Sequence, residues 1–334
     1  MTISNAKISA VEMYVPEKIL TNKELEKMVD TTNEWILERT GIRTRHICEK
    51  GQAASDLAAE AVIKLCKKRG ISPKDIELII VPTVTPDMLF PSTACLLQEK
   101  IGADNAWGFD LSGACSGFLF ALSVAEKYIQ TGIYRRVVVV GSEIMSSIAD
   151  YTNRETCVLF GDAAGAVLLE PAEEGEKGII DILLRCDGSG GKYLYMPGGG
   201  SLHPATHETV DKKMHYIHQQ GRRVFKFAVT EMANISREIM KKNNITSDQV
   251  KLYVPHQANM RIIKACQANL GFTDDQIIIN IQKYGNTTSA TIPLCLYEAS
   301  QEGRIKKGDY LVLASFGAGF TWGSILLQWE IENS

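Results

Sequence analysis

Hydrophobic and polar residues alternate along this chain in two distinct patterns. Short apolar runs at residues 77–85, 107–111 and 137–141 are typical of buried β-strands. Between them, apolar residues recur every three or four positions at residues 92–101 and 115–130, which predicts amphipathic helices. Because strands that alternate with helices indicate parallel sheets covered by helices, we predict an α/β fold.

The second half of the chain repeats this alternation. We expect strands at residues 251–255, 276–281 and 309–316, and helices at residues 224–242, 257–270 and 289–302. Residues 71–82 also resemble residues 245–255, and residues 131–141 resemble the segment that begins at Glu302. Either any two strand–helix–strand units look alike, or one half of the chain copies the other.

If the copy is real, the chain divides into residues 1–174 and 175–334. The boundary then falls in a polar stretch rich in Glu and Gly near residues 171–177. The polar segment at about 187–222 is then an insertion in the second half.

Composition and charge narrow the class of protein. Of 334 residues, 45% are hydrophobic and 22% charged, the balance of a globular protein with a sizeable core. A net charge of -3 gives no reason to expect nucleic acid or an anionic membrane as partner. No apolar run is long enough to cross a bilayer, and Met1 to Lys7 lack the features of a signal peptide. The eight cysteines are scattered without a CxxC pair, which favours a reducing, cytoplasmic location.

Four of the six histidines lie in one polar stretch: His203, His207, His215 and His218. Neither HExxH nor a Cys/His spacing accompanies them. We therefore expect a solvated loop there and no metal site.

Cys115 is the best candidate nucleophile. It lies in Leu-Ser-Gly-Ala-Cys-Ser-Gly at residues 111–117, between a predicted strand and a long predicted helix. Small neighbours permit a sharp turn and a close approach by a ligand. The positive end of the helix dipole favours the thiolate, and free N–H groups at the turn can bind an oxyanion. A structural cysteine in a glycine-rich turn is the alternative.

His256 and Asn286 each follow a predicted strand, where a parallel sheet opens its ligand crevice. Alone, each would be an ordinary loop histidine or a turn asparagine. Because both occupy strand-to-helix turns equivalent to that of Cys115, we predict that the three share one site. The glycine-containing loop at residues 316–320 lets a backbone N–H approach a substrate, but it is not a dinucleotide motif.

Six stretches in one order resemble β-ketoacyl-acyl-carrier-protein synthase III, the initiating condensing enzyme of bacterial-type fatty acid synthesis. They are NEWILERTGIR at residues 33–43, GACSGF at 113–118, LFGDAAG at 159–165, VPHQAN at 254–259, YGNT at 284–287 and FGAGFTWG at 316–323. The resemblance implies the thiolase-type fold, two pseudo-symmetric βαβαβ halves in a five-layered αβαβα arrangement. It also implies a homodimer.

The resemblance also implies a reaction. Cys115 would take the acyl group of an acyl-CoA, and His256 and Asn286 would bind the thioester carbonyl of malonyl-acyl carrier protein during decarboxylation. Backbone N–H groups of Cys115 and Ala318 would form the oxyanion hole. Because decarboxylation supplies the carbanion without a strong base, no acidic general base is required near Cys115. We expect no cofactor beyond the CoA thioester substrate, and no metal.

The family's binding residues carry over to further positions. Trp35 and Arg154 would sandwich the adenine of CoA, and Arg39 would help to bind its phosphates. Phe90 would close the acyl pocket of the neighbouring subunit. The pantetheine channel and its mouth would involve Phe225, Asn259 and Phe316, and a basic patch for an acidic carrier protein would comprise Lys226, Arg261 and Lys264. For Lys264, a merely solvated basic face is the alternative.

Two departures leave questions open. Ala318 stands where the family usually has Gly, and a positive φ there would cost about 1 kcal/mol or more. The polar stretch around residues 203–218 is longer than in typical members, so the acyl preference is not predicted. A thiolase-fold enzyme of secondary metabolism, with another starter or a CoA-bound acceptor, remains the alternative.

More distant classes fit the residues less well. A true thiolase would have a second cysteine near Phe316, and a papain-like hydrolase would have other residues around Cys115. The intact Cys115, His256 and Asn286 also argue against a catalytically idle partner subunit.

Overall fold

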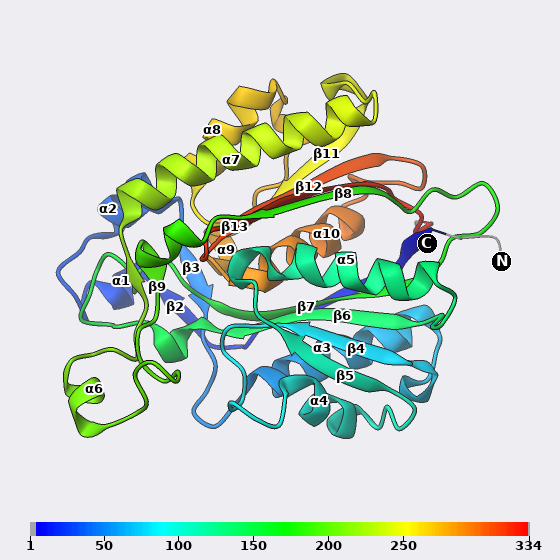
Figure 1. Ribbon diagram of the computed structural model, residues 1–334. Helices are drawn as coiled ribbons and strands as arrows, with labels where there is room; N and C mark the ends of the chain where they lie inside the picture. The colour runs from blue at the N-terminus through cyan, green and yellow to red at the C-terminus, as the bar shows by residue number, and fades with distance from the viewer. Residues whose placement is uncertain (1–4, 333–334) are drawn as a thin grey trace.

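The computed structural model describes residues 5–332, so residues 1–4 of the stretch inspected for a signal peptide, and residues 333–334, lie outside the described part. Five layers make up the structure, and two of them are β-sheets (Figure 1). The first sheet has the order β1-β7-β6-β4-β5. Its strands are β1 (Ala6–Tyr14), β7 (Asp162–Pro171), β6 (Val137–Ile144), β4 (Leu78–Pro82) and β5 (Trp107–Leu111).

The second sheet repeats four positions of the first. Its order is β11-β12-β13-β8, with β11 (Val250–Pro255), β12 (Tyr310–Gly317), β13 (Thr321–Gln328) and β8 (Ile179–Cys186). In both sheets a parallel pair is followed by an antiparallel neighbour: β4 with β6 and then β7, β11 with β12 and then β13. The two-half division at 174/175 remains a prediction, and this common order is in keeping with it.

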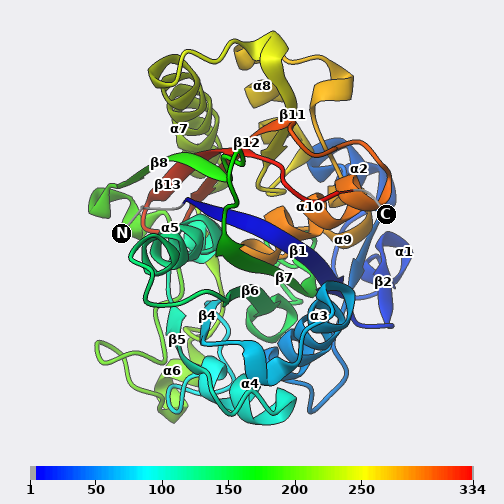
Figure 2. The same ribbon diagram turned by 90° about the vertical axis from the view of Figure 1, so that its right-hand side faces the viewer.

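Helices occupy the other three layers. Between the sheets lie α5 (Gly117–Gln130) and α10 (Thr291–Gln301) (Figures 1 and 2). The outer face of the first sheet is covered by α3 (Ala54–Arg69) and α4 (Thr93–Ile101), and that of the second by α7 (Gly221–Lys242) and α8 (Met260–Leu270). This is the predicted αβαβα arrangement.

The middle layer joins the two sheets in one core. A single cluster of buried side chains includes Phe118 and Leu122 of α5 and Ile292 and Leu296 of α10, together with residues of both sheets. Burial of apolar surface on this scale is the main stabilising term in folding. The two halves therefore share this central core, whereas another buried cluster belongs to the first half alone.

Two long connections lie outside the layers. Residues 15–53, between β1 and α3, contain β2 (Ile19–Thr21), α1 (Asn22–Leu25), α2 (Asn33–Thr40) and β3 (Thr44–His46). Residues 187–220, between β8 and α7, contain β9 (Leu194–Tyr195), α6 (His207–Asp211) and β10 (His218–Gln219). The predicted insertion thus has a counterpart of comparable length at the equivalent place in the first half.

Most predicted elements are present with boundaries shifted by a few residues, but residues 276–281 do not form a strand. Ile277 makes a single bridge to Tyr253, and α9 (Ile281–Tyr284) follows. Hydrogen bonds from the side chain of Gln257 take the place of pairing with a neighbouring strand. Its amide donates to the Ile278 carbonyl at 3.3 Å and accepts from the Asn280 N–H at 3.1 Å. This segment holds the place that β5 has in the first sheet.

The polar histidine stretch has ordinary contacts. His207 begins α6, His215 Nε2 lies 2.9 Å from the Thr209 hydroxyl, and the His218 ring stacks on Tyr195. Within residues 5–332, no group of three or more His, Cys, Asp or Glu side chains could hold a metal ion. No helix in that range combines the length and apolarity needed to span a bilayer.

Candidate active site

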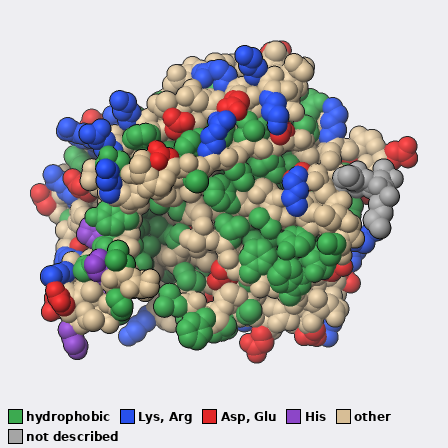
Figure 3. Space-filling view, viewed as in Figure 1, with side chains coloured by type: hydrophobic (Ala, Val, Ile, Leu, Met, Phe, Trp, Pro, Cys, Tyr) green, Lys and Arg blue, Asp and Glu red, His purple; other side chains and the backbone are tan. Residues whose placement is uncertain are grey.

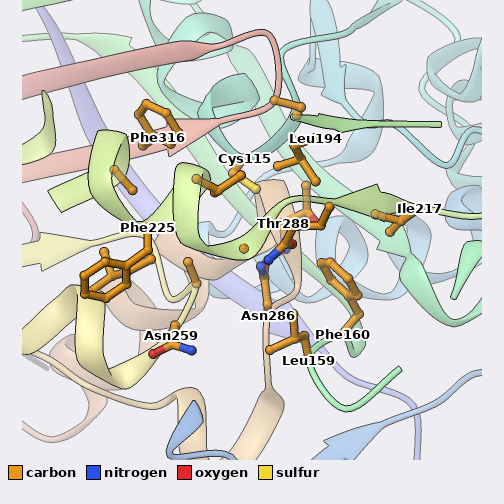
Figure 4. Close-up of a pocket in the computed structure, with 18 of the residues that line it drawn as sticks. Cys115, Leu159, Phe160, Leu194, Ile217, Phe225, Asn259, Asn286, Thr288 and Phe316 are labelled. Carbon is orange, nitrogen blue, oxygen red and sulfur yellow. The ribbon is translucent and has the colours of Figure 1, made fainter. Parts of the chain in front are cut away.

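Cys115, His256 and Asn286 line one cavity of about 800 Å³. The cavity lies where the first half of the chain meets the second, and Figure 4 shows Cys115 and Asn286 facing each other across it. The predicted convergence of the three side chains is therefore found. Seven further predicted residues also line this cavity: Trp35, Arg39, Phe225, Asn259, Arg261, Phe316 and Ala318.

Cys115 lies in the 3-10 turn Ala114–Ser116, directly before α5. The end of β12 packs against this turn: Ser315 Oγ donates to the Cys115 carbonyl at 2.7 Å. Gly317 permits the contact, because a Cβ there would lie 2.8 Å from the Cys115 nitrogen. A strand of the second half thus fixes the backbone of the nucleophile.

The pKa of Cys115 moves in the direction opposite to that expected at a helix N-terminus. Burial is the main cause and raises the pKa to about 12, and the charge of Glu143 adds to the effect. The Cys115 N–H and the Thr288 hydroxyl, which has no hydrogen-bond partner within residues 5–332, oppose this rise, because each can donate to a thiolate. Desolvation outweighs the turn's favourable donors.

His256 follows β11 and is 1% exposed. Its Nδ1 lies 2.6 Å from Thr291 Oγ1, whereas Nε2 has no hydrogen-bond partner within residues 5–332. Burial lowers the pKa of His256 to about 3, so the imidazole is neutral at ordinary pH. Nε2 is the nitrogen available to a substrate.

Asn286 follows the short helix α9 and not a strand, because residues 276–281 form none. Its backbone instead bonds to the 159–161 segment: the Asn286 N–H donates to the Leu159 carbonyl at 2.8 Å. The Thr288 N–H donates to Asn286 Oδ1 at 2.9 Å, which fixes the orientation of the carboxamide. Nδ2 is left as a donor on the cavity side.

Glu143 is an acidic residue close enough to Cys115 to affect its pKa, and the sequence motifs did not indicate it. It is fully buried at the end of β6, and its carboxyl contacts Thr83, Val84, Thr85 and Ser289. Burial raises its pKa to about 7. The sequence did contain a signal, an acid three residues after the apolar run at 137–140, but its proximity to Cys115 arises only on folding.

The predicted adenine site is partly assembled. Trp35 lies on α2, and the guanidinium groups of Arg39 and Arg154 lie 5.6 and 5.3 Å from the centre of its ring. Arg154 also donates to the Asp30 carbonyl at 3.0 Å and does not itself line the cavity. Cation–π contacts of this kind hold both cations at the indole.

Asn259 connects two parts of the cavity mouth. As N-cap of α8, its Oδ1 accepts from the Arg261 N–H at 2.9 Å, and its Nδ2 donates to the Arg39 carbonyl at 2.9 Å. The Arg261 guanidinium lies over the Phe225 ring, 5.4 Å from its centre. Phe316 is buried and packs on Phe320.

Besides Arg154, three predicted residues lie outside this chain's cavity. Phe90 is 81% exposed in the loop between β4 and α4. Lys226 and Lys264 are exposed on α7 and α8, and Lys264 Nζ lies 2.7 Å from Asp274. Ala318 does line the cavity, but the positive φ of its loop falls on Gly319, at +142°, so the strain considered for Ala318 does not arise.

The apolar wall of the cavity was not predicted. Figure 4 shows Leu159, Phe160, Leu194 and Ile217 around the space next to Cys115 and Asn286. Leu194 and Ile217 come from the polar segment at 187–222, where isolated apolar residues were the only signal. Arg222, at the start of α7, also lines the cavity and was missed.

Comparisons with known proteins agree with this architecture. Residues 109–188 match the family described as 3-Oxoacyl-[acyl-carrier-protein (ACP)] synthase III, and residues 240–329 match the description of its C-terminal part. A relative from Koribacter versatilis, named beta-ketoacyl-[acyl-carrier-protein] synthase III, is 56% identical over 98% of this chain and 99% of its own length.

Solved structures extend the comparison. The 3-oxoacyl-[acyl-carrier-protein] synthase III of Aquifex aeolicus is 40% identical, with a TM-score of 0.89 over 97% of this chain and all of its own. A priming β-ketosynthase of the R1128 polyketide pathway has a TM-score of 0.91 over 99% of this chain and 98% of its own, but is only 31% identical.

The five-layered fold and the three converging groups define a thiolase-fold condensing enzyme, a class of acyltransferase. Identity above 50% over nearly the whole chain then decides the branch. The chain belongs to the β-ketoacyl-[acyl-carrier-protein] synthase III family. Because the relatives at 52–56% identity are named synthase III, the secondary-metabolism alternative is the weaker one.

Proposed function

We propose that this enzyme takes an acyl group from an acyl-CoA onto Cys115 and condenses it with malonyl-acyl carrier protein. The products are β-ketoacyl-acyl carrier protein, CoA and CO₂, and the reaction initiates fatty acid synthesis. The observation that supports this most is the convergence of a buried thiol, a free imidazole nitrogen and a free carboxamide on one cavity.

Acyl transfer comes first. The Cys115 sulfur attacks the thioester carbon, the bond from that carbon to the CoA sulfur breaks, and CoA leaves with the proton that Cys115 gave up. Backbone N–H groups of Cys115 and Ala318 stabilise the oxyanion of the intermediate. Covalent storage of the acyl group divides the condensation into two easier steps.

Condensation follows. His256 Nε2–H and the Asn286 carboxamide donate to the thioester carbonyl of the malonyl group, the bond to its carboxylate breaks, and CO₂ leaves. The resulting enolate carbon attacks the acyl carbon, and the Cys115 sulfur is released. Loss of one such donor typically costs about 2.7–4 kcal/mol of transition-state stabilisation. For His256 to donate through Nε2, the Thr291 hydroxyl must turn its one hydrogen from the Thr288 carbonyl, 3.1 Å away, to Nδ1, 2.6 Å away.

CoA enters through the cavity mouth. Trp35 and Arg154 hold the adenine, Arg39 binds phosphate, and Phe225, Asn259 and Phe316 line the pantetheine path. The acyl chain occupies the apolar wall, and Phe90 of a partner subunit closes it; the exposure of Phe90 leaves it free for that contact. No cofactor or metal ion takes part.

The acidic carrier protein docks beside the mouth on Lys226, Arg261 and Lys264. Figure 3 shows Lys and Arg side chains gathered over the region of α2 and the start of α7. Because Lys264 is paired with Asp274, Lys226 and Arg261 contribute more of the attraction.

The enzyme forms a homodimer through the edge of the first sheet. β5 is the last strand of that sheet, so one side of it has no strand partner within residues 5–332. Trp107, Phe109, Tyr128 and Tyr134 form a ring cluster there, and Figure 3 shows apolar side chains gathered over this region. An exposed apolar patch at an unpaired edge is typical of an interface. Eight unbridged cysteines favour a location in the cytoplasm.

Intact-mass analysis after exposure to a panel of acyl-CoAs tests the first step. We expect a mass increase of one acyl group in the native enzyme and none in Cys115→Ser. Addition of malonyl-acyl carrier protein should then discharge the acyl group and release CO₂. Discharge by malonyl-CoA alone would assign a CoA-bound acceptor, and no adduct with any acyl-CoA would refute the proposed donor.

A further inference from the structure

Glu143 is buried without a counter-ion. Within residues 5–332, no Lys, Arg or His nitrogen lies within salt-bridge distance of its carboxyl. Its Oε2 accepts from Thr83 Oγ1 at 3.1 Å, from the Val84 N–H at 3.1 Å and from Thr85 Oγ1 at 2.7 Å. Its Oε1 has one partner, Ser289 Oγ, at 2.9 Å. An unpaired buried carboxylate is costly, and such groups tend to keep their proton.

The hydrogen-bond geometry at Ser289 points to the same state. Ser289 Oγ lies 2.8 Å from the Pro82 carbonyl oxygen and 2.9 Å from Glu143 Oε1. A hydroxyl has one hydrogen. If Glu143 were ionised, that hydrogen could satisfy only one of the two oxygens, and the other would contact Ser289 Oγ lone pair to lone pair.

A proton on Glu143 Oε1 satisfies every atom. Glu143 then donates to Ser289 Oγ, Ser289 donates to the Pro82 carbonyl, and Oε2 keeps its three donors. A carboxylic acid held in an apolar site can remain neutral at neutral pH and donate a hydrogen bond in this way.

The hydrogen bond between Glu143 and Ser289 is connected through the neighbouring residues to Asn286 and His256. Ser289 lies in the 3-10 turn Thr288–Ala290, which follows Asn286. The Thr288 N–H fixes the Asn286 carboxamide, and the Thr288 carbonyl accepts from the Thr291 hydroxyl that contacts His256. Gly141 lets β6 meet this turn closely, because a Cβ there would lie 2.6 Å from the Ser289 carbonyl oxygen.

We propose that Glu143 is a positioning residue held as a neutral carboxylic acid: its proton anchors the Ser289 turn, and its neutrality spares Cys115 a neighbouring negative charge. The inference rests on the proposed role of Cys115 only for its second part. The protonation state itself follows from the contacts.

The proposal has a defined pH dependence. The groups that face the carboxyl are the neutral hydroxyls of Thr83, Thr85 and Ser289 and the Val84 N–H, and Cys115 is the titratable group that its charge affects. Burial raises the pKa of Glu143 from 4.5 to about 7. As the pH rises through 7, Glu143 ionises, and the new charge makes the Cys115 proton harder to remove.

Infrared spectroscopy of the wild-type enzyme with ¹³C-labelled Glu carboxyl groups tests the state directly. The label separates Glu143 from the other buried acid with a raised pKa, Asp162. We expect an isotope-shifted carbonyl band of a protonated acid at pH 6 that disappears at pH 9. Absence of that band at pH 6 would overturn the proposal, whether or not any variant folds.

The variant Glu143→Gln assigns the band and tests the effect on Cys115. A carboxamide reproduces the protonated acid, because its N–H₂ donates to Ser289 and its oxygen accepts the same three bonds. We expect the band to be absent and the pH midpoint of Cys115 alkylation by iodoacetamide to fall by about one unit.

Ser289→Ala is the matched control. It removes the acceptor of the Glu143 proton but leaves the charge of Glu143 able to form, so the alkylation midpoint should not fall. An unchanged midpoint in Glu143→Gln, or an equal fall in both variants, would refute the electrostatic part.

Discussion

Thr288 combines two features that one residue seldom shows. It is β-branched, yet its φ is +51°, a region that branched side chains avoid. Strain of roughly 1–3 kcal/mol is kept where the surroundings over-determine a conformation, often at active sites. Here the conformation directs into the cavity a hydroxyl that stabilises the Cys115 thiolate (Figure 4).

Removal of that hydroxyl should therefore slow acylation. We expect Thr288→Val to reduce the rate at which acyl-CoA acylates Cys115 by about tenfold or more, because a hydrogen bond to a charged group contributes about 1.5–3 kcal/mol. Thr287→Val is the matched control, since Thr287 is buried beside it but does not line the cavity. Equal rates in the two variants, measured by quenched intact-mass kinetics, would exclude the role.

Burial of His256 should make the fold sensitive to acid. Its pKa is 6.5 in the unfolded reference and about 3 when folded, so the unfolded chain binds the proton more readily between these values. The contribution to stability is complete above pH 6.5 and is lost as the pH falls toward 3. We expect His256→Gln to remove roughly a few kcal/mol of the acid-induced loss in denaturant titrations. The exposed-site variant His207→Gln should leave the slope unchanged.

Residue types in their sequence context sufficed to identify Cys115, His256 and Asn286 and to expect them together. They did not reveal Glu143, which lies on another strand and reaches the site only through β6. Nor did they reveal the direction of the Cys115 pKa, because the helix N-terminus is visible in sequence whereas the depth of burial is not.

At the scale of elements, two glycines allow strands to meet turns. Gly141 in β6 accommodates the Ser289 turn, and Gly317 in β12 accommodates the Cys115 turn. They occupy corresponding places in the two sheets, each in the strand of the parallel pair that also borders an antiparallel neighbour.

A methyl group at position 317 should therefore act on both stability and chemistry. We expect Gly317→Ala to destabilise the fold by about 1–3 kcal/mol, because the new Cβ meets backbone, and to slow acylation by displacing the turn. Gly200→Ala is the control, since no atom lies within 4 Å of its added Cβ. Similar unfolding free energies for both variants would show that the contact is easily relaxed.

The one element predicted wrongly shows what periodicity omits. Residues 276–281 have the apolar composition of a strand, but a strand also needs a partner for its backbone. Here Gln257 and Arg304 side chains bond to that backbone, Arg304 at the Ile277 carbonyl at 2.8 Å. Side chains from distant segments can replace a ladder, and no local pattern announces them.

At the scale of the whole molecule, the unpaired side of β5 leads to a prediction about assembly. Ile133 is 61% exposed in the loop after α5, near the Trp107 cluster. We expect Ile133→Glu to shift the homodimer toward monomer in sedimentation velocity, because a charge would be buried at the interface. Ile63→Glu, at an exposed isoleucine on α3, should leave assembly unchanged. A wild-type monomer at all concentrations would refute the dimer.

Fixation of the Cys115 turn by Ser315, Gly317 and Thr321 has a consequence for synthesis on the ribosome. Cys115 emerges early, but Ser315, in the first of the strands that brace it, is translated 200 residues later. In a nascent or truncated chain without these strands, the Cys115 turn has no support. The carbonyl groups of Cys115 and Gly113 then lack the hydroxyl donors of Ser315 and Thr321. We therefore expect a chain that ends before β12 to leave Cys115 unacylated, so that a partial product of translation does not consume acyl-CoA.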